Sequence, residues 1–124
     1  MRKLANAELN RISVDEYKNT KKTPLVIVLD NVRSLNNIGS VFRTADAFLI
    51  KKIFLCGITA TPPHREIHKT ALGATESVDW QHVPETADCI QQLKSDGYTI
   101  ISVEQTNESK MLNDYTVDFN QNKY

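Results

Sequence analysis

The sequence has few of the residues that mark specialised classes of chain: two cysteines, four glycines and four prolines among 124 residues. The cysteines, Cys56 and Cys89, lie 33 positions apart without CxxC spacing. This excludes a disulfide framework or a zinc ribbon and predicts two reduced, buried thiols. The low glycine and proline content excludes a collagen-like or low-complexity chain. With 40% hydrophobic and 24% charged residues, the composition is that of one globular domain.

Long hydrophobic runs are also missing. The longest, "PLVIVL" at 24–29, is far shorter than the roughly 20 apolar residues that span a bilayer. Arg2 and Lys3 are not followed by the apolar stretch of a secretory signal. We therefore expect a cytoplasmic protein with no membrane partner.

The chain has no net charge, because 15 Lys and Arg balance 15 Asp and Glu. The charges are unevenly distributed, however. Residues 1–75 hold 12 basic and 6 acidic side chains, a net of +6, whereas residues 76–124 hold 3 and 9, a net of −6. The basic first half is suited to contacts with phosphate groups. A chance asymmetry that folding mixes on one surface explains the same counts.

Apolar patterning predicts an α/β fold with a mainly parallel sheet and helices on both faces. Ser13 and Glu16 match a capping box and predict a short helix from Val14 to Thr20. We assign residues 1–22 to an N-terminal helical extension and 23–124 to the main domain. Strands are predicted at 24–30, 51–58, 77–83 and 98–104, and helices at 37–48, 84–96 and, within the loop 59–77, around 64–69.

Common catalytic motifs do not match. The turn after the first strand, "DNVRSLNNIGS", holds one glycine and fits neither the dinucleotide-binding nor the P-loop pattern. His64 and His68 have the spacing of zinc ligands on a helix, but Arg65 stands where a zinc protease has glutamate, and a third ligand is missing. No metal is predicted. Asp30, at the end of the first strand, is either a general base or a turn cap.

The stretch "LNNIGSVFRTA" at 35–45 lies where α/β folds usually bind ligands. Asn37 is able to cap a helix, and Gly39 permits close approach of a neighbour or a ligand. Arg43, inside an apolar run, is either an exposed residue on a surface helix or the binder of an anion. Spacing alone leaves both interpretations open.

"LDNVRSLNNIGSVFRTADAF" resembles motif 1 of the SpoU branch, or TrmH family, of the SPOUT superfamily, with the core N-x-G-x-x-x-R-T-A falling on Asn37, Gly39, Arg43, Thr44 and Ala45. "HKTALGATESVDW" is similar to the small-residue segment before the family's third strand. The resemblance implies a SPOUT-like Rossmannoid of the α/β-knot class. It also implies a homodimeric enzyme that transfers a methyl group from S-adenosylmethionine to a ribose 2′-hydroxyl of tRNA or rRNA.

The resemblance also assigns roles to residues. Arg43 is then the catalytic residue, and Asn37 helps to shape its site. The loop after the fourth strand predicts cofactor contacts at Val103, Glu104 and Gln105, and the basic first half predicts RNA contacts at Arg33, Asn36, Arg65 and Lys69.

The sequence departs from the family near its end. The family's second and third motifs, a G-N-E-like and an S-L-N-like segment, do not occur. We therefore expect a domain that is C-terminally incomplete and lacks the knot-forming part, is inactive alone, and binds S-adenosylmethionine weakly or not at all. The alternative is a non-catalytic RNA-binding or dimerisation module. A receiver-like or nucleotide-binding domain is disfavoured, because its acidic cluster and glycine fingerprint are missing.

Overall fold

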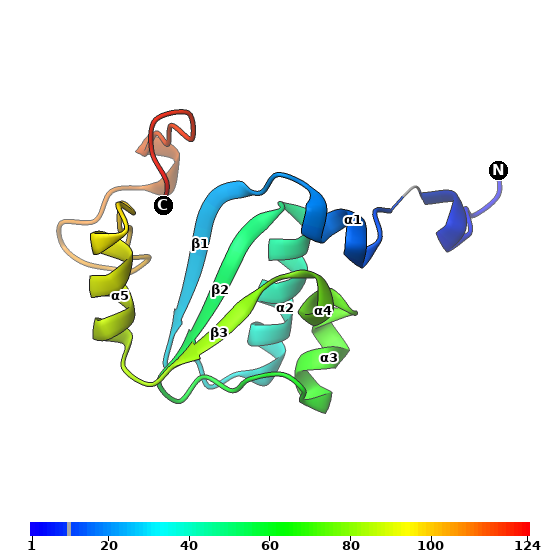
Figure 1. Cartoon of the computed structure of the whole chain (residues 1–124), viewed down its shortest axis with the longest axis horizontal. Helices are drawn as coiled ribbons and strands as arrows, with labels where there is room; N and C mark the ends of the chain where they lie inside the picture. Colours follow the sequence, from blue (N-terminus) through cyan, green and yellow to red (C-terminus); the bar gives the residue numbers. More distant parts are fainter. Residues whose placement is uncertain (10) are drawn as a thin grey trace.

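The computed structural model describes residues 1–9 and 11–124. Its strands form one parallel sheet in the order β1-β2-β3, with β3 at one edge. Figure 1 shows α5 on one face of this sheet and α2, α3 and α4 on the other, which confirms the predicted α/β class. The elements are η1 (Asn6–Leu9), α1 (Val14–Asn19), β1 (Thr23–Asp30), α2 (Leu35–Ala47), β2 (Ile50–Cys56), α3 (Arg65–Ala71), α4 (Ala74–Ser77), β3 (Trp80–Val83), α5 (Thr86–Ser95) and η2 (Leu112–Asp114).

Helix α1 is closed at its start by the predicted cap. The Ser13 hydroxyl accepts a hydrogen bond from the backbone N–H of Glu16 at 3.1 Å. The same helix is attached to the rest of the fold by Tyr17, which is 1% exposed. The Tyr17 hydroxyl donates toward the carbonyl oxygens of Ile50 (3.1 Å) and Ala45 (3.3 Å). The capping prediction is confirmed, and one aromatic side chain links the N-terminal helix to α2 and β2.

Each face of the sheet has its own apolar core, as the period of two along a strand requires. Leu25, Ile27 and Leu29 of β1 pack with the helices α2 to α4. Their neighbours Val26 and Val28 face α5 and its Cys89, beside Cys56 of β2. Both thiols are free and buried, so this prediction is confirmed. The larger core contains Tyr17, Ile38, Phe42, Ala45, Ile50, Ile53, Leu55, Ile67, Ala71, Ala74 and Val78.

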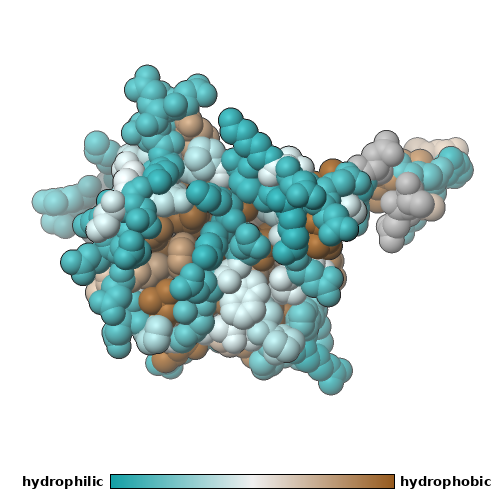
Figure 2. Space-filling model, viewed as in Figure 1, coloured by the Kyte–Doolittle hydropathy of each residue, from teal (hydrophilic) through white to brown (hydrophobic). Residues whose placement is uncertain are grey.

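Strand β1 is less buried than its sequence predicts. Residues 23–29 are half-buried and Asp30 is exposed, because β1 has a hydrogen-bonded strand on only one side. Figure 2 shows hydrophobic residues reaching the surface between α5 and the sheet. Both faces of β1 are nevertheless covered, one by each apolar core, so its exposure comes from the open edge.

The predicted fourth strand at 98–104 does not form; residues 98–106 have no regular secondary structure. The chain end occupies part of the β1 edge instead. The Tyr124 N–H donates to the Pro24 carbonyl at 3.0 Å, and the Val26 N–H donates to the Tyr124 carbonyl at 2.7 Å. Thr99 in turn donates its N–H to the Lys123 carbonyl. The prediction fails because Lys123 and Tyr124 lie between β1 and the segment 98–104 that was expected to pair with it.

Among the described residues, no helix combines the length and the apolar composition that crossing a bilayer requires. The longest helix, α2, has 13 residues.

We expect the free energy of unfolding to fall as the pH rises from about 9 to about 12. Burial raises the pKa of Tyr17 to about 12, aided by the charges of Asp46 and Asp79, and it raises the pKa of Cys89 to about 12 as well. The ordinary values are 10.0 and 9.0. Above these values the unfolded chain loses protons that the native chain retains, so deprotonation favours unfolding. Urea denaturation across this range measures the effect.

The control for this pH dependence is Tyr17→Phe, compared with Phe at the exposed Tyr115. The first variant removes one of the shifted groups and flattens the curve above about pH 10, whereas the second leaves it unchanged. A free energy of unfolding that stays level or rises between pH 9 and 12 would contradict the buried, protonated state of these groups.

Candidate functional site

Helix α2 begins two residues earlier than predicted, and a serine caps it. The Ser34 hydroxyl accepts a hydrogen bond from the backbone N–H of Asn37 at 3.2 Å. Asn37 therefore lies within the first turn of α2, where its own side chain is exposed. The interpretation of Asn37 as a cap is wrong, because Ser34 stands three residues before it and already satisfies its N–H.

Helix α2 presents an exposed polar face. Asn36, Ser40 and Arg43 follow each other at intervals of four and three residues and so lie on one side of the helix. Ile38 and Phe42 lie on the opposite side and are buried. The Arg43 guanidinium makes no side-chain hydrogen bond or ion pair with any residue that the structure describes. Arg43 is thus a surface residue whose charge is available to an anion.

Gly39 is the point of closest approach between α2 and α3. A Cβ atom on Gly39 would lie 2.0 Å from the Thr70 hydroxyl oxygen and 2.2 Å from the carbonyl oxygen of Ile67. The Thr70 hydroxyl donates a hydrogen bond to the Asn36 carbonyl oxygen at 2.8 Å. Gly39 therefore allows the close approach of a neighbouring helix, which is one of the two roles that the sequence leaves open for it.

Helix α3 carries two of the predicted RNA contacts. Arg65 and Lys69 are exposed, and Lys69 forms an ion pair with Glu66 at 3.0 Å. His64 caps the helix: its Nδ1 accepts the backbone N–H of Glu66 at 3.1 Å. Both histidines of this segment are exposed, and His64 differs from His68 in that its ring caps the helix. Within residues 1–9 and 11–124, no group of three His, Cys, Asp or Glu side chains is arranged to hold a metal ion.

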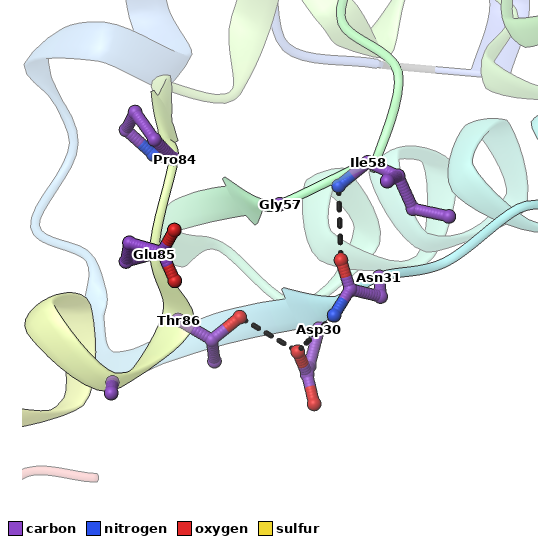
Figure 3. Close-up of a pocket in the computed structure, with 8 residues that line it drawn as sticks. Asp30, Asn31, Gly57, Ile58, Pro84, Glu85 and Thr86 are labelled. Atoms are coloured by element: carbon purple, nitrogen blue, oxygen red, sulfur yellow. Dashed lines mark hydrogen bonds between the residues drawn. The ribbon is translucent and has the colours of Figure 1, made fainter.

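A polar cavity of about 400 Å³ lies where the three strands end (Figure 3). The Asp30 carboxylate accepts hydrogen bonds from the Thr86 hydroxyl (2.6 Å) and from the Asn31 amide (3.2 Å). The Asn31 side-chain oxygen accepts the backbone N–H of Ile58 at 3.0 Å. Glu85 contributes a second carboxylate to the lining. Asp30 is thus held by side chains that follow β1 and β3, and it acts as a structural acceptor at this edge.

The buried Thr59, which is 2% exposed, connects the ends of β1 and β2. Its hydroxyl oxygen accepts a hydrogen bond from the backbone N–H of Val32 at 3.0 Å. The same hydroxyl donates its hydrogen bond toward two carbonyl oxygens, that of Cys56 at 2.7 Å and that of Leu29 at 3.1 Å. Our sequence reasoning missed Thr59 and Asn31. The signal that would have found them is their position: polar residues directly after neighbouring parallel strands meet at one edge of the sheet.

The residues predicted to hold S-adenosylmethionine do not fit that role in this structure. Val103 is 97% exposed, and Glu104 and Gln105 are exposed as well. Glu104 contacts only its own segment, through Gln105 and Ser109. Because the fourth strand does not form, no loop follows it to the edge where β1, β2 and β3 end. Residues 103–105 therefore contribute no wall to an enclosed, mainly apolar pocket of the kind that a nucleoside cofactor needs.

The comparisons with known proteins agree on one family. The model of the SpoU rRNA Methylase family matches residues 24–124. A 23S rRNA (guanosine-2′-O-)-methyltransferase, RlmB, from Neisseria meningitidis is 27% identical over 107 residues, covering 86% of this chain and 43% of that protein. RlmB from Vibrio parahaemolyticus is 31% identical over 90 residues, covering 73% of this chain and 36% of that protein. This chain thus spans about two fifths of the length of these curated relatives.

A solved structure shows the same likeness. A proposed RNA methyltransferase of the TrmH family from Porphyromonas gingivalis superposes with a TM-score of 0.55 and 27% identity, covering 60% of this chain and 30% of that one. The parallel strands and helices described above are therefore the SPOUT-type arrangement that the sequence predicts.

Replacing Gly39 by alanine tests the packing of α2 on α3. The new Cβ would clash with a backbone oxygen as well as with Thr70, so the helices must separate. Overpacking of this kind costs about 1–3 kcal/mol, against a gain of up to about 1 kcal/mol from the higher helix propensity of alanine. We expect Gly39→Ala to lower the free energy of unfolding, as measured by urea denaturation. The exposed Thr44→Ala is the matched control, because no hydrogen bond of the Thr44 side chain occurs among the described residues, and a Gly39→Ala variant as stable as wild type would refute the close contact.

Proposed function

This chain belongs to the SpoU rRNA methylase family, and on that premise we propose that it is a domain of an RNA methyltransferase. The reaction is transfer of a methyl group from S-adenosylmethionine to a ribose 2′-hydroxyl of rRNA or tRNA. The proposal keeps residues 1–22 as a helical extension and 23–124 as the methyltransferase part, and it places the protein in the cytoplasm as a homodimer. Curated relatives that carry RNA methyltransferase names support it.

The observation that carries the proposal is the position of Arg43. The family pattern falls on this residue, and its guanidinium is exposed with no partner among the described side chains. A guanidinium barely deprotonates, so Arg43 is unsuited to act as a base. It is suited to bind a backbone phosphate and to stabilise negative charge that develops beside the 2′-oxygen. Asn37, on the first turn of the same helix, is proposed to shape this site.

The proposed RNA contacts lie on two helices that touch. Arg33 precedes α2 and Asn36 lies in its first turn, while Arg65 and Lys69 lie on α3, and all four are exposed. The contact between Thr70 and Asn36 joins the two helices at this surface. Cationic and amide side chains on one exposed surface suit contacts to the phosphates and sugars of RNA.

The cofactor part of the proposal rests on the family alone. S-adenosylmethionine supplies the methyl group when it is bound. The tail residues 103–105 are exposed and do not line the cavity at the strand ends, so we propose that the cofactor site needs an arrangement that this chain does not adopt by itself. The alternative function is a non-catalytic RNA-binding or dimerisation module, and the exposed tail favours it. Methyl transfer from labelled S-adenosylmethionine to bulk RNA, lost in Arg43→Ala, separates the enzyme from the module.

We expect Arg43→Gln to weaken the binding of bulk ribosomal RNA about tenfold, because a hydrogen bond to a charged group is lost. The slope of log affinity against log salt should fall by about one, as expected for one lost phosphate contact. Fluorescence anisotropy with labelled RNA measures both. Lys94→Gln, at an exposed cation on α5, is the matched control. Equal losses in the two variants would show that general charge, and not the α2 face, binds RNA.

We also expect the 124-residue chain alone to give no binding heat with micromolar S-adenosylmethionine in a calorimetric titration. The reason is the exposure of Val103 and its neighbours, which offer no enclosed apolar wall. The titration is repeated with ribosomal RNA present, to include a site that forms only on RNA. A micromolar affinity in either titration would refute the proposed incompleteness of the cofactor site.

A further inference from the structure

The carbonyl oxygen of Asn36 accepts hydrogen bonds from two side-chain hydroxyls. Ser40, one turn further along α2, donates its hydroxyl to this oxygen at 3.0 Å. Thr70, which lies 34 positions later and on α3, donates its own hydroxyl at 2.8 Å. Thr70 lies outside the stretch from Asn37 to Ala45 that carries the family pattern. The first turn of α2 is therefore held from a second helix.

The geometry explains why the hydroxyl reaches across. Threonine hydroxyls on helices commonly bond a carbonyl of their own preceding turn, and here the carbonyl of Ile67 lies 3.4 Å away, against 2.8 Å for the oxygen of Asn36. Because Gly39 has no side chain, α3 lies close enough for the shorter bond. The Thr70 hydroxyl thus links α3 to α2 more strongly than it bonds to the preceding turn of α3.

We propose that Thr70 is a positioning residue for RNA binding: its bond to the Asn36 carbonyl fixes the first turn of α2 and so the direction of the Asn36 side-chain amide toward RNA. The first turn of α2 is closed at its start by Ser34, and the bond from Thr70 adds a link to a second helix, so this turn and the side chains on it keep a fixed position relative to α3. The same bond fixes the distance between this turn and Lys69, the residue before Thr70. This inference rests on the proposed RNA binding.

A double-mutant cycle tests the proposal on the full chain. Bulk ribosomal RNA, labelled with fluorescein, is titrated by anisotropy against Thr70→Val, Thr70→Ser, Asn36→Ala and the double variant Asn36→Ala with Thr70→Val. Asn36→Ala removes the amide but keeps the carbonyl that Thr70 contacts. Thr75→Val is the matched control, because no hydrogen bond of its side chain occurs among the described residues. Circular dichroism melting reports folding of each variant.

We expect Thr70→Val to weaken RNA binding about three- to tenfold, the equivalent of one hydrogen bond. Thr70→Ser and Thr75→Val should bind within about twofold of wild type, and Thr70→Val should add less than about twofold in the Asn36→Ala background. A loss that persists undiminished in that background, or no loss at all, overturns the positioning role. If Thr70→Val does not fold, Thr70→Ala replaces it, and failure of both to fold makes Thr70 a structural residue and overturns the proposal.

Failure of the proposed function gives a different pattern. A wild-type chain that does not bind RNA, or binding that is insensitive to Arg43→Gln, refutes RNA recognition by α2, and the role of Thr70 with it. Binding that depends on Arg43 but is unchanged by Asn36→Ala leaves the function standing and overturns only the inference about Thr70.

Discussion

The close packing of α2 on α3 at Gly39 is the contact on which the candidate site depends. It brings the Thr70 hydroxyl within hydrogen-bond distance of the Asn36 carbonyl and places the cations of both helices on neighbouring exposed surfaces. On the side of α2 that faces away from these cations, Ile38, Phe42 and Ala45 are completely buried. This burial fixes the rotation of the helix about its axis. Arg43 faces solvent as a direct consequence, because it lies on the side of the helix away from these residues. Its exposure therefore follows from the packing of the core.

Those parts of the fold that depend on local signals were predictable from the sequence. Ser13 and Glu16 define the start of α1, and Gly97, with a φ of 89°, follows the end of α5 at a position where helices commonly end in glycine. The buried patterns of β1 and β2 also mark real strands. The segment at 98–104 has an equally apolar pattern but remains irregular, since such a pattern shows that a segment favours burial and not which neighbour it will have. Here the contact of Tyr124 with Pro24 and Val26 takes part of the edge that it needed.

The residues of the candidate site also differ in whether local sequence signals predict them. Periodicity alone left Arg43 undecided between a surface residue and an anion binder, and the family pattern decided in favour of function. Thr70 could not be predicted from local sequence, because it acts through a hydrogen bond to a residue 34 positions away. Asn31 and Thr59 act over 27 positions, and only their place after neighbouring parallel strands marks them in the sequence. Ser34 shows a smaller difficulty. It and Asn37 both belong to residue types that cap helices, and only the conformation of the turn distinguishes them.

The two sides of the proposed active centre differ in how the chain builds them. The RNA side is made of helices with buried inner faces, so the backbone positions from which its side chains project are fixed. The proposed cofactor side falls on residues 103–105, where Val103 is 97% exposed, and the segment that follows leaves Leu112 and Met111 85% and 70% exposed. Burial of these apolar side chains would lower the free energy of the chain, because it removes apolar surface from water. Ile101 and Val103 belong to the segment that fails to form a strand, so this segment leaves apolar side chains exposed. Any arrangement that pairs 98–104 with the free part of the β1 edge would bury this surface and carry residues 103–105 toward the strand ends. On the proposed function, pairing of residues 98–104 with β1 would therefore complete the sheet and bring the proposed cofactor residues 103–105 into the site in the same step.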